Sequence, residues 1–200
     1  KSLGNIYTLR DLEKQGFNPL SFRLMVIDSN YRNKLDFTFE NLRKYEKMLA
    51  KIDLSVKALN KIEKYEEKED SYSRIQVKRN VDSKMQEFKD AVNDDLNTHE
   101  ALQIFLFVLD LADERIKKGK IDKEEFFMLS SAISKMNEFL GAYTDYEVPQ
   151  EIIDLAEERE RKSKEKQFPE ADILRERIRD KGYFIADLAE TFVITKKYLE

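Results

Sequence analysis

The sequence predicts a mainly α-helical protein, an antiparallel helix bundle with a small C-terminal appendage of helices and a β-hairpin. Of its 200 residues, 38% are charged, whereas only five are Gly and three are Pro, a composition typical of long helices with solvated faces. Apolar residues recur at steps of three and four over most of the chain, which is the period of an amphipathic helix. Aromatic and β-branched runs at 183–185 and 191–195 favour a hairpin.

The composition also narrows the class of protein. The chain has no Cys, which excludes disulfides and Cys-ligated zinc in these residues and is compatible with a cytoplasmic location. No apolar run approaches ~20 residues, so we expect no membrane span, and we find no export signal. His99 is the only His, so we expect no His-based triad and no metal site. The net charge of −4 means that any RNA contact must come from local basic patches.

The first third of the chain predicts three helices. Thr8 and Asp11 form a capping box for a short helix that Gly16 ends. Asn18-Pro19 opens a second helix with a cap followed by Pro at its first position, and its apolar face is Leu20, Leu24, Ile27 and Tyr31. Thr38 caps a third, predicted to run to about Lys68, with a heptad seam made of Leu42, Tyr45, Leu49, Ile52, Val56 and Leu59.

The middle of the chain predicts the rest of the bundle. A helix from about Ile75 to Asn93 ends at a polar corner, and Thr98 or Asn97 caps the next helix. Apolar residues nearly surround the axis from 101 to 111, which indicates a helix buried on several sides, and Gly119 is expected to end it. Asp122 opens a further helix with a second capping box, whose buried stripe is Phe126, Leu129, Ile133, Met136 and Leu140 and which ends at Gly141.

The last third predicts the appendage. Residues 141–148 form a tether, and Pro149 starts a helix with Ile152, Ile153 and Ala156 inward and 157–166 outward. A second helix, 170–181, has the inward set Ile173, Leu174 and Ile178 and is closed by Gly182. We therefore divide the chain into connecting helices at 1–37, a bundle at 38–141 and a helix pair with a hairpin at 142–200.

Three stretches resemble one known family. The corner Phe88-Lys-Asp-Ala-Val-Asn-Asp-Asp-Leu-Asn-Thr-His-Glu-Ala-Leu102 is similar to the D-D-L-N-T-P signature of cysteinyl-tRNA synthetases, with His99 in place of the usual Pro. Pro19-Leu-Ser-Phe-Arg23 with Asn30-Tyr-Arg-Asn-Lys-Leu-Asp-Phe-Thr38 resembles the family's H-Y-R-x-x-L-x-F-T pattern, with Asn30 in place of His. Lys1-Ser-Leu-Gly-Asn5 looks like the second half of the K-M-S-K-S-L-G-N loop of class I aminoacyl-tRNA synthetases.

The C-terminal end resembles the same family. Residues 158–182 follow its pattern of Glu-Arg, an aromatic residue, Ala-Asp, Arg and a closing Gly, through Glu158, Arg159, Lys166, Phe168, Ala171, Asp172, Leu174, Arg175, Ile178 and Gly182. The sequence departs from the pattern at Lys162, where Ala is usual. It departs again at Glu190, where a turn Gly is usual, which leaves the geometry of the hairpin turn open.

The resemblance implies a fold and a function. The fold would be the class Ia anticodon-binding type, and the bundle a tRNA-binding, DALR-like domain. The parent enzyme would activate L-cysteine with ATP and transfer it to tRNA(Cys), with zinc and ATP bound upstream of Lys1. Lys1, beside Ser2, would contact the ATP phosphates as a catalytic residue. The 200 residues would be an inactive C-terminal fragment that acts with the upstream catalytic domain as a monomer.

Candidate tRNA contacts lie on three segments. Arg23 and Arg32 either reach the inner limb of the tRNA, clamp the two domains together or form structural ion pairs, and an ion pair is favoured for each. Basic side chains of the last two helices are candidate phosphate contacts, and an aromatic side chain at 183–184 is a candidate to stack on an anticodon base. The set is Arg23, Arg32, Arg159, Arg161, Lys162, Lys166, Arg175, Arg179 and Tyr183, with Lys164, Arg177, Lys181 and Phe184 beside them.

Two other readings remain open. The chain is compatible with a helical bundle that binds a protein partner and has no RNA role; the net charge of −4 favours this alternative, and the basic residues of the last two helices and Lys1-Ser-Leu-Gly-Asn5 disfavour it. A ligase that joins cysteine to an amino sugar shares the catalytic half of the family, although the long C-terminal region argues against it.

Overall fold

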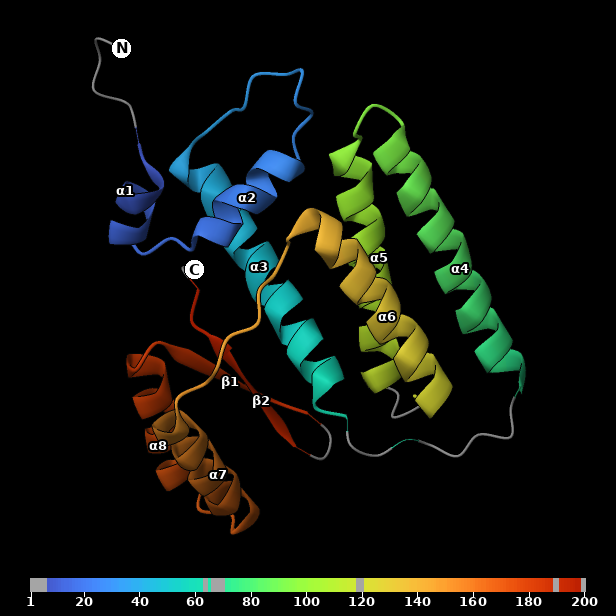
Figure 1. The fold of residues 1–200 in the computed structure, drawn as a ribbon. Coiled ribbons are helices and arrows are strands. Elements are labelled where there is room, and N and C mark those ends of the chain that lie inside the picture. Colours follow the sequence, from blue (N-terminus) through green and yellow to red (C-terminus); the bar gives the residue numbers. More distant parts are fainter. Residues whose placement is uncertain (1–6, 63–64, 66–70, 118–120, 189–190, 199–200) are drawn as a thin grey trace.

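The computed structural model describes residues 7–62, 65, 71–117, 121–188 and 191–198, and within them it contains eight helices and two strands. Four long helices stand side by side, and a smaller unit of two helices and a hairpin lies against α3 (Phe39–Asn60), on the side away from α4 (Ser71–Asn93) (Figure 1). The prediction of a mainly α bundle with a hairpin appendage is therefore confirmed.

The first two helices begin where the sequence predicts. α1 (Leu9–Lys14) has the capping box of Thr8 and Asp11, and α2 (Pro19–Ile27) is capped by Asn18. The backbone N–H of Asn18 also donates to the carboxylate of Glu46, a buried residue of the next helix, at 2.6 Å. The start of α2 is therefore fixed both locally and by the bundle.

The predicted apolar face of α2 is wrong at its last member. The helix ends at Ile27, and Tyr31 lies outside it with 62% of its surface exposed. Ser29 Oγ donates to the carbonyl of Met25, and Asn30 Oδ1 accepts from the backbone of Arg32. Short polar side chains that bond the local backbone in this way compete with helix continuation.

The bundle consists of α3 (Phe39–Asn60), α4 (Ser71–Asn93), α5 (Thr98–Lys117) and α6 (Lys123–Leu140). Thr38 caps α3 as predicted, but the helix ends at Asn60 and not near Lys68, because the heptad seam has no apolar continuation after Leu59. α4 begins four residues before the predicted start at Ile75. The predicted stop at Gly119 lies outside the described residues.

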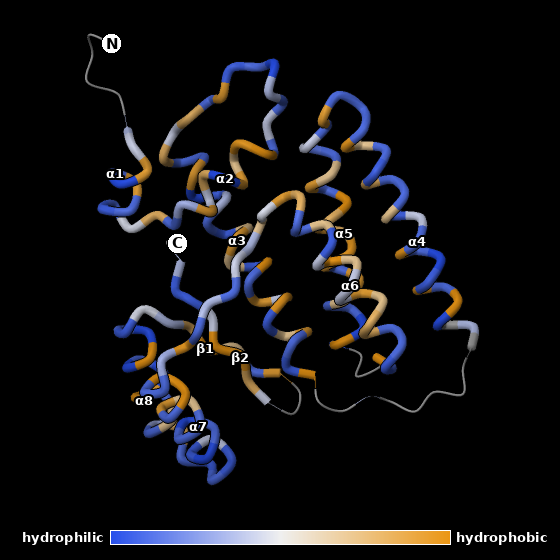
Figure 2. The backbone as a smooth tube through the Cα atoms, in the orientation of Figure 1, coloured by the Kyte–Doolittle hydropathy of each residue, from blue (hydrophilic) through white to orange (hydrophobic). Residues whose placement is uncertain are grey.

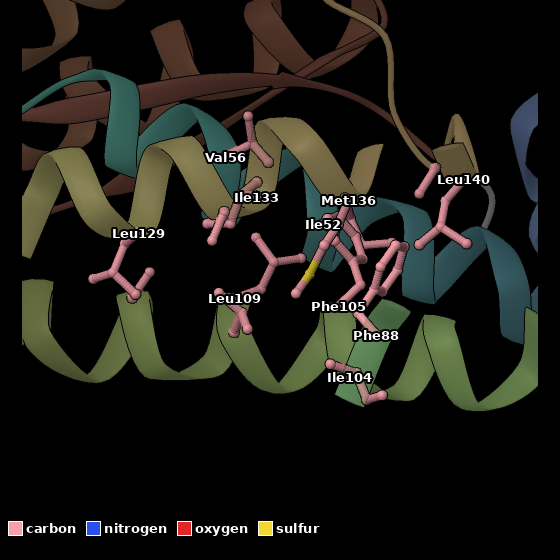
Figure 3. Packing of buried hydrophobic residues seen from close by; sticks show 14 of the residues in the cluster. Ile52, Val56, Phe88, Ile104, Phe105, Leu109, Leu129, Ile133, Met136 and Leu140 are labelled. Atoms are coloured by element: carbon pink, nitrogen blue, oxygen red, sulfur yellow. The ribbon is translucent and has the colours of Figure 1, made fainter. Parts of the chain in front are cut away.

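The main core surrounds α5. This helix packs against α2, α3, α4 and α6, and Ala101, Leu102, Phe105, Val108 and Leu109 are each at most 1% exposed. Figure 3 shows α3, α5 and α6 contributing side chains to this core, with Phe105 beside Met136 and Ile52. In Figure 2 the tube of α5 is largely orange, in contrast to the blue helices at the edge of the molecule. The prediction that 101–111 is buried on several sides holds, with Phe107 as an exposed exception.

A buried ion pair connects the end of α5 to the start of α6. Asp122 and Glu125 form the predicted capping box of α6. Glu125 is fully buried, and both of its carboxylate oxygens accept hydrogen bonds from Arg115 of α5, at 2.8 and 2.9 Å from Nη2. One carboxylate therefore caps α6 and ties it to the end of α5.

The C-terminal unit consists of α7 (Gln150–Lys164), α8 (Phe168–Asp180), β1 (Tyr183–Asp187) and β2 (Phe192–Lys196). The strands pair antiparallel with Ile185 opposite Ile194. Phe192 and Ile194 join a small core with α7 and α8. Val193 and Thr195 are buried on the opposite face of β2, which packs against α3.

Two details of this unit differ from the sequence-based prediction. Ile173 is 55% exposed and does not belong to the inward set of α8, where Ala171 takes its place beside Leu174 and Ile178. The inward stripe is narrower than predicted because α8 packs mainly against one neighbouring helix, α7. Glu190 lies outside the described residues.

Arg23 joins α2 to the end of α6. Its Nε donates to the carbonyl of Leu140 at 2.8 Å. Gly141 follows with φ 57°, in the left-handed region, and a Cβ added there would lie 2.9 Å from two guanidinium nitrogens of Arg23. Gly141, the C-cap of α6, therefore permits both the left-handed backbone turn and the close approach of Arg23.

We predict that Gly141→Ala lowers the free energy of unfolding by about 1–2 kcal/mol, through left-handed strain and the contact with Arg23. Gly182→Ala is the matched control, because Gly182 also has a positive φ of 83° but open space around it. Urea denaturation measures the free energy of unfolding of both variants, each with and without Arg23→Ala. The coupling energy between Gly141→Ala and Arg23→Ala isolates the contact of the added methyl group with Arg23. Equal losses at the two glycines would contradict the prediction.

We further predict that Glu125→Ala destabilises the bundle by about 3 kcal/mol, because it removes a buried carboxylate that caps one helix and binds the guanidinium of another. Glu124→Ala is the control. Glu124 accepts from Arg74 at 3.0 Å but is 66% exposed, so its loss should leave the denaturation midpoint nearly unchanged. Similar midpoints for the two variants would show that the buried pair adds no stability.

Candidate nucleic-acid interface

Two of the family-like motifs, which lie some sixty residues apart in the sequence, meet at the surface. Tyr31 Oη donates to Asp95 Oδ1 at 2.7 Å, and Arg32 Nη2 lies 2.7 Å from Asp95 Oδ2. Arg32 Nε also contacts Tyr31 Oη at 3.1 Å. Both Arg32 and Asp95 are more than half exposed, so Arg32 forms the structural ion pair that the sequence left open and still faces solvent.

Two residues with a left-handed backbone set the shape of the corner between α4 and α5. Asp95 and Leu96 both have positive φ, 54° and 53°, a conformation that costs about 1 kcal/mol for a residue with a side chain. The backbone N–H of Asn97 donates to the carbonyl of Ala91 at 3.0 Å, which closes the end of α4. Asn97 Oδ1 accepts from the N–H of Glu100 at 3.2 Å. Asn97, and not Thr98, is therefore the cap of α5.

Asp28, at the end of α2, connects this corner to the bundle. Its carboxylate accepts from Tyr45 Oη of α3 at 2.9 Å and lies 2.8 Å from His99 Nδ1 and 3.2 Å from Gln103 Nε2 of α5. Burial of the Tyr45 hydroxyl, together with its bond to Asp28, raises its pKa to about 12. His99 thus supplies a contact that the usual Pro of the family pattern lacks.

The basic side chains of α7 and α8 lie mostly on the surface, next to acids. Figure 2 shows both helices as mainly hydrophilic. Five of their nine predicted phosphate contacts lie within 4 Å of a Glu carboxylate of α7 or α8. These pairs are Arg161–Glu158, Lys162–Glu170, Lys164–Glu160, Arg179–Glu176 and Lys181–Glu151. The Lys162 side chain is 22% exposed, and the other four cations are more exposed. Exposed pairs contribute little to stability, so a phosphate can replace the acid at small cost.

Arg159 does not lie outward as predicted. It is 7% exposed, and both of its terminal nitrogens bond the carboxylate of Asp187 in β1, one of them at 2.7 Å. Arg175 Nη2 of α8 reaches the same carboxylate at 2.9 Å. Arg159 therefore joins α7 to the hairpin, and its position could have been found in the sequence, because Ile152, Ala156 and Arg159 share the spacing of one helix face.

Arg159 and Arg175 also set the electrostatics of Asp187. The hydrogen bonds from Arg159 hold the pKa of the Asp187 carboxyl below its usual range, against the opposing effect of burial, and the charge of Arg175 adds to the lowering. The carboxylate is therefore ionised over the whole physiological range, and it holds three elements of the C-terminal unit together.

The hairpin presents a different aromatic residue from the one in the predicted set. Tyr183 is partly buried and packs against the small core of the C-terminal unit. Phe184, on the other face of β1, is 51% exposed and lies opposite Thr195 in the register. Of the two side chains proposed for base stacking, Phe184 is the more accessible one.

The other predicted site residues are located as follows. Arg23 is held by the end of α6, through the carbonyl of Leu140, and Lys166 is exposed in the turn between α7 and α8. Lys1 and Ser2 lie outside the described residues. Among the described residues no three His, Asp or Glu side chains are grouped so as to hold a metal ion, and no helix there has the length and apolarity to cross a membrane.

The chain is similar to curated proteins of one name. It is 33% identical to the cysteine–tRNA ligase of Prochlorococcus marinus strain MIT 9301 and 31% identical to that of Chlamydia abortus, with 94% of this chain matched in each case. It is 27% identical to the cysteine–tRNA ligase of Leptospira interrogans over 98% of this chain. No protein-family model matches.

The matches cover nearly all of this chain but only a part of each relative. The chain spans 42% of the Prochlorococcus and Leptospira proteins and 39% of the Chlamydia protein. Its motifs, its helical fold and these matches agree: the chain is homologous to a part of the cysteine–tRNA ligases, which are class I aminoacyl-tRNA synthetases.

Proposed function

We propose that this chain is the C-terminal, tRNA-binding part of a cysteine–tRNA ligase and that it holds tRNA(Cys) for a catalytic domain of the same protein. The observation that carries the proposal is the similarity to cysteine–tRNA ligases along 94% of the chain. The parent enzyme would use ATP to activate L-cysteine and would act in the cytoplasm as a monomer. A ligase for an amino sugar is disfavoured because the matched relatives are tRNA ligases.

The described residues would contribute binding and not bond formation. The chain has no Cys, and its described residues include no group of three side chains that could hold a metal ion, so zinc does not fit these described residues and would be held elsewhere in the parent. Lys1 and Ser2 remain candidates for contact with the ATP phosphates. Apart from them we assign no catalytic residue, and we expect the 200 residues alone to be inactive.

The proposed tRNA surface has two parts. Arg32, at the corner of the bundle, is exposed while Asp95 fixes its direction, which suits contact with an RNA backbone. On the C-terminal unit, Arg161, Lys162, Lys166 and Arg179 would contact phosphates, and Phe184, in preference to Tyr183, would stack on an unpaired base. Arg159 and Arg175 would position this unit through Asp187.

A second candidate, a bundle that binds a protein partner, is favoured by one observation. The cations of α7 and α8 are paired with carboxylates, which is the arrangement of an ordinary solvated surface. Titration with tRNA separates the two candidates, because only the first predicts specific, salt-sensitive binding.

We predict that the chain binds tRNA(Cys) more tightly than a mismatched tRNA, and that Arg161→Gln/Lys166→Gln/Arg179→Gln weakens binding. The slope of log K against log salt should become shallower by up to about 0.9 for each phosphate that the variant no longer neutralises. Fluorescence anisotropy at two or more salt concentrations measures both effects.

The matched control is Lys51→Gln/Lys78→Gln/Lys84→Gln, which removes three bundle lysines that are paired with acids, as Arg161 and Arg179 are. It changes the net charge by the same amount and should leave the slope closer to that of the wild type. No binding of tRNA(Cys) at low salt, or equally weakened binding in the two triple variants, would overturn the assignment of α7 and α8 as a phosphate-binding surface.

We also predict that Asp187→Asn lowers the free energy of unfolding at pH 7 by about 1–2 kcal/mol, because Arg159 is buried against this carboxylate. Since the folded pKa of Asp187 is depressed, its contribution is complete above the ordinary carboxyl pKa of about 4 and is lost as the pH falls through the lower folded pKa. The gap between variant and wild type should therefore shrink in acid.

Glu176→Gln is the control for this measurement, because Glu176 pairs with Arg179 at 3.2 Å on an exposed surface. Denaturant titrations of the three proteins between pH 3 and 7 give the comparison. A gap for Asp187→Asn that does not change with pH would mean that the ionised carboxylate is not what stabilises the unit.

A further inference from the structure

A buried carboxylate lies where three separate segments of the chain meet. Asp53, on α3, is 6% exposed. Its Oδ2 accepts a hydrogen bond from Tyr146 Oη of the segment between α6 and α7, and a second at 3.0 Å from Tyr198 Oη, beyond β2. The segment before the C-terminal unit and the segment after it are thus bonded to one oxygen of the bundle.

Tyr146 extends this contact to the hairpin. Its hydroxyl accepts from the backbone N–H of Lys196 at 2.8 Å. The ammonium of Lys57, one turn after Asp53 on α3, lies 3.9 Å from the centre of its ring, and that of Lys196 lies 4.4 Å away. The ring is therefore held by cations of both the bundle and the hairpin.

Apolar packing at this junction is incomplete. A cleft of about 220 Å³ lies beside Asp53, between the start of α2, α3, the segment after α6 and the end of β2. Burial raises the pKa of the Asp53 carboxyl, although the two tyrosine hydroxyls and Lys57 oppose the shift. A carboxylate in this environment has an unfavourable solvation energy unless its hydrogen bonds are kept.

We propose that Asp53 is the positioning residue that fixes the orientation of the C-terminal unit on the bundle. Val193 and Thr195 bring β2 against α3 without specifying a direction, whereas the two tyrosine hydroxyls must converge on one oxygen. Asp53 would thereby also align the two parts of the tRNA surface, a role that rests on the proposed function. The control of the orientation by Asp53 does not depend on that function.

The first test measures the orientation itself. Because the chain has no Cys, Ser131→Cys on α6 and Asp172→Cys on α8, both at exposed positions, give a unique pair of spin labels. Double electron–electron resonance should show one narrow distance distribution for the parent chain and a broadened or shifted one for Asp53→Ala. Asp53→Asn keeps an oxygen acceptor and should restore most of the narrow distribution.

The matched control is Asp113→Ala. Asp113 of α5 is a partly buried carboxylate whose pKa is raised by burial, and it accepts from Ser55 of α3 at 2.7 Å, within the bundle. Its loss should leave the distance distribution unchanged. Tyr146→Phe and Tyr198→Phe keep the rings but remove the hydroxyls, and each should broaden the distance distribution. These two variants replace Asp53→Ala in the test if Asp53→Ala does not fold. Distributions for both tyrosine variants as narrow as the parent's would overturn the proposal.

The second test connects orientation to RNA. Asp53→Ala should bind tRNA(Cys) about tenfold more weakly, because a loosened unit lowers the effective concentration of the second contact, and Asp53→Asn should restore binding. If the distances broaden but the parent chain binds no tRNA, the proposed function fails and the positioning role stands. If tRNA binds and Asp53→Ala changes neither distance nor affinity, the positioning role fails alone.

Discussion

The rest of the structure depends on the burial of α5. This helix has apolar side chains on most of its surface, so it is stable only if other elements cover it on several sides at once. α3, α4 and α6 do so along its length, and α2 covers its first turns (Figure 1). The polar corner at Asp95 and Leu96 fixes where α5 begins. At the other end of α5, the ion pair between Arg115 and Glu125 fixes where α6 begins.

Ion pairs and hydrogen bonds that include a buried charged side chain connect the parts of the fold. Glu125 joins α6 to α5, Asp187 joins the hairpin to α7 and α8, and Asp53 joins α3 to the segments before and after the C-terminal unit. Apolar packing provides most of the stability but specifies direction weakly, whereas a buried charged group, such as Glu125, Asp53 or Arg159, tolerates only arrangements that keep its hydrogen bonds. Most cations of the proposed RNA surface differ from these groups, because they are exposed to solvent.

Much of the fold was accessible from local patterns. The caps at Thr8, Asn18, Thr38 and Asp122 and the stop at Gly141 depend on residues within one turn of each other, and all were predicted correctly. The end of α3 and the exposure of Tyr31 were missed although local residues account for both, since the heptad seam stops after Leu59 and Ser29 and Asn30 bond the local backbone. The exposure of Ile173 was missed because it depends on which neighbour covers α8. For the candidate site, the sequence identified the motif residues, but it did not predict that Arg159 is buried or that Phe184 is more accessible than Tyr183.

The sequence by itself determined the helical class, the positions of the caps, the hairpin and the family that the motifs resemble, since all of these follow from residues close together in the chain or from their order. Only the tertiary structure decided that Tyr31 and Arg32 meet Asp95, that Arg159 and Arg175 share Asp187, and that Asp53 receives Tyr146 and Tyr198. These partners are separated by 12 to 145 residues. No local period or propensity relates residues so far apart; their contact is set by how the helices pack.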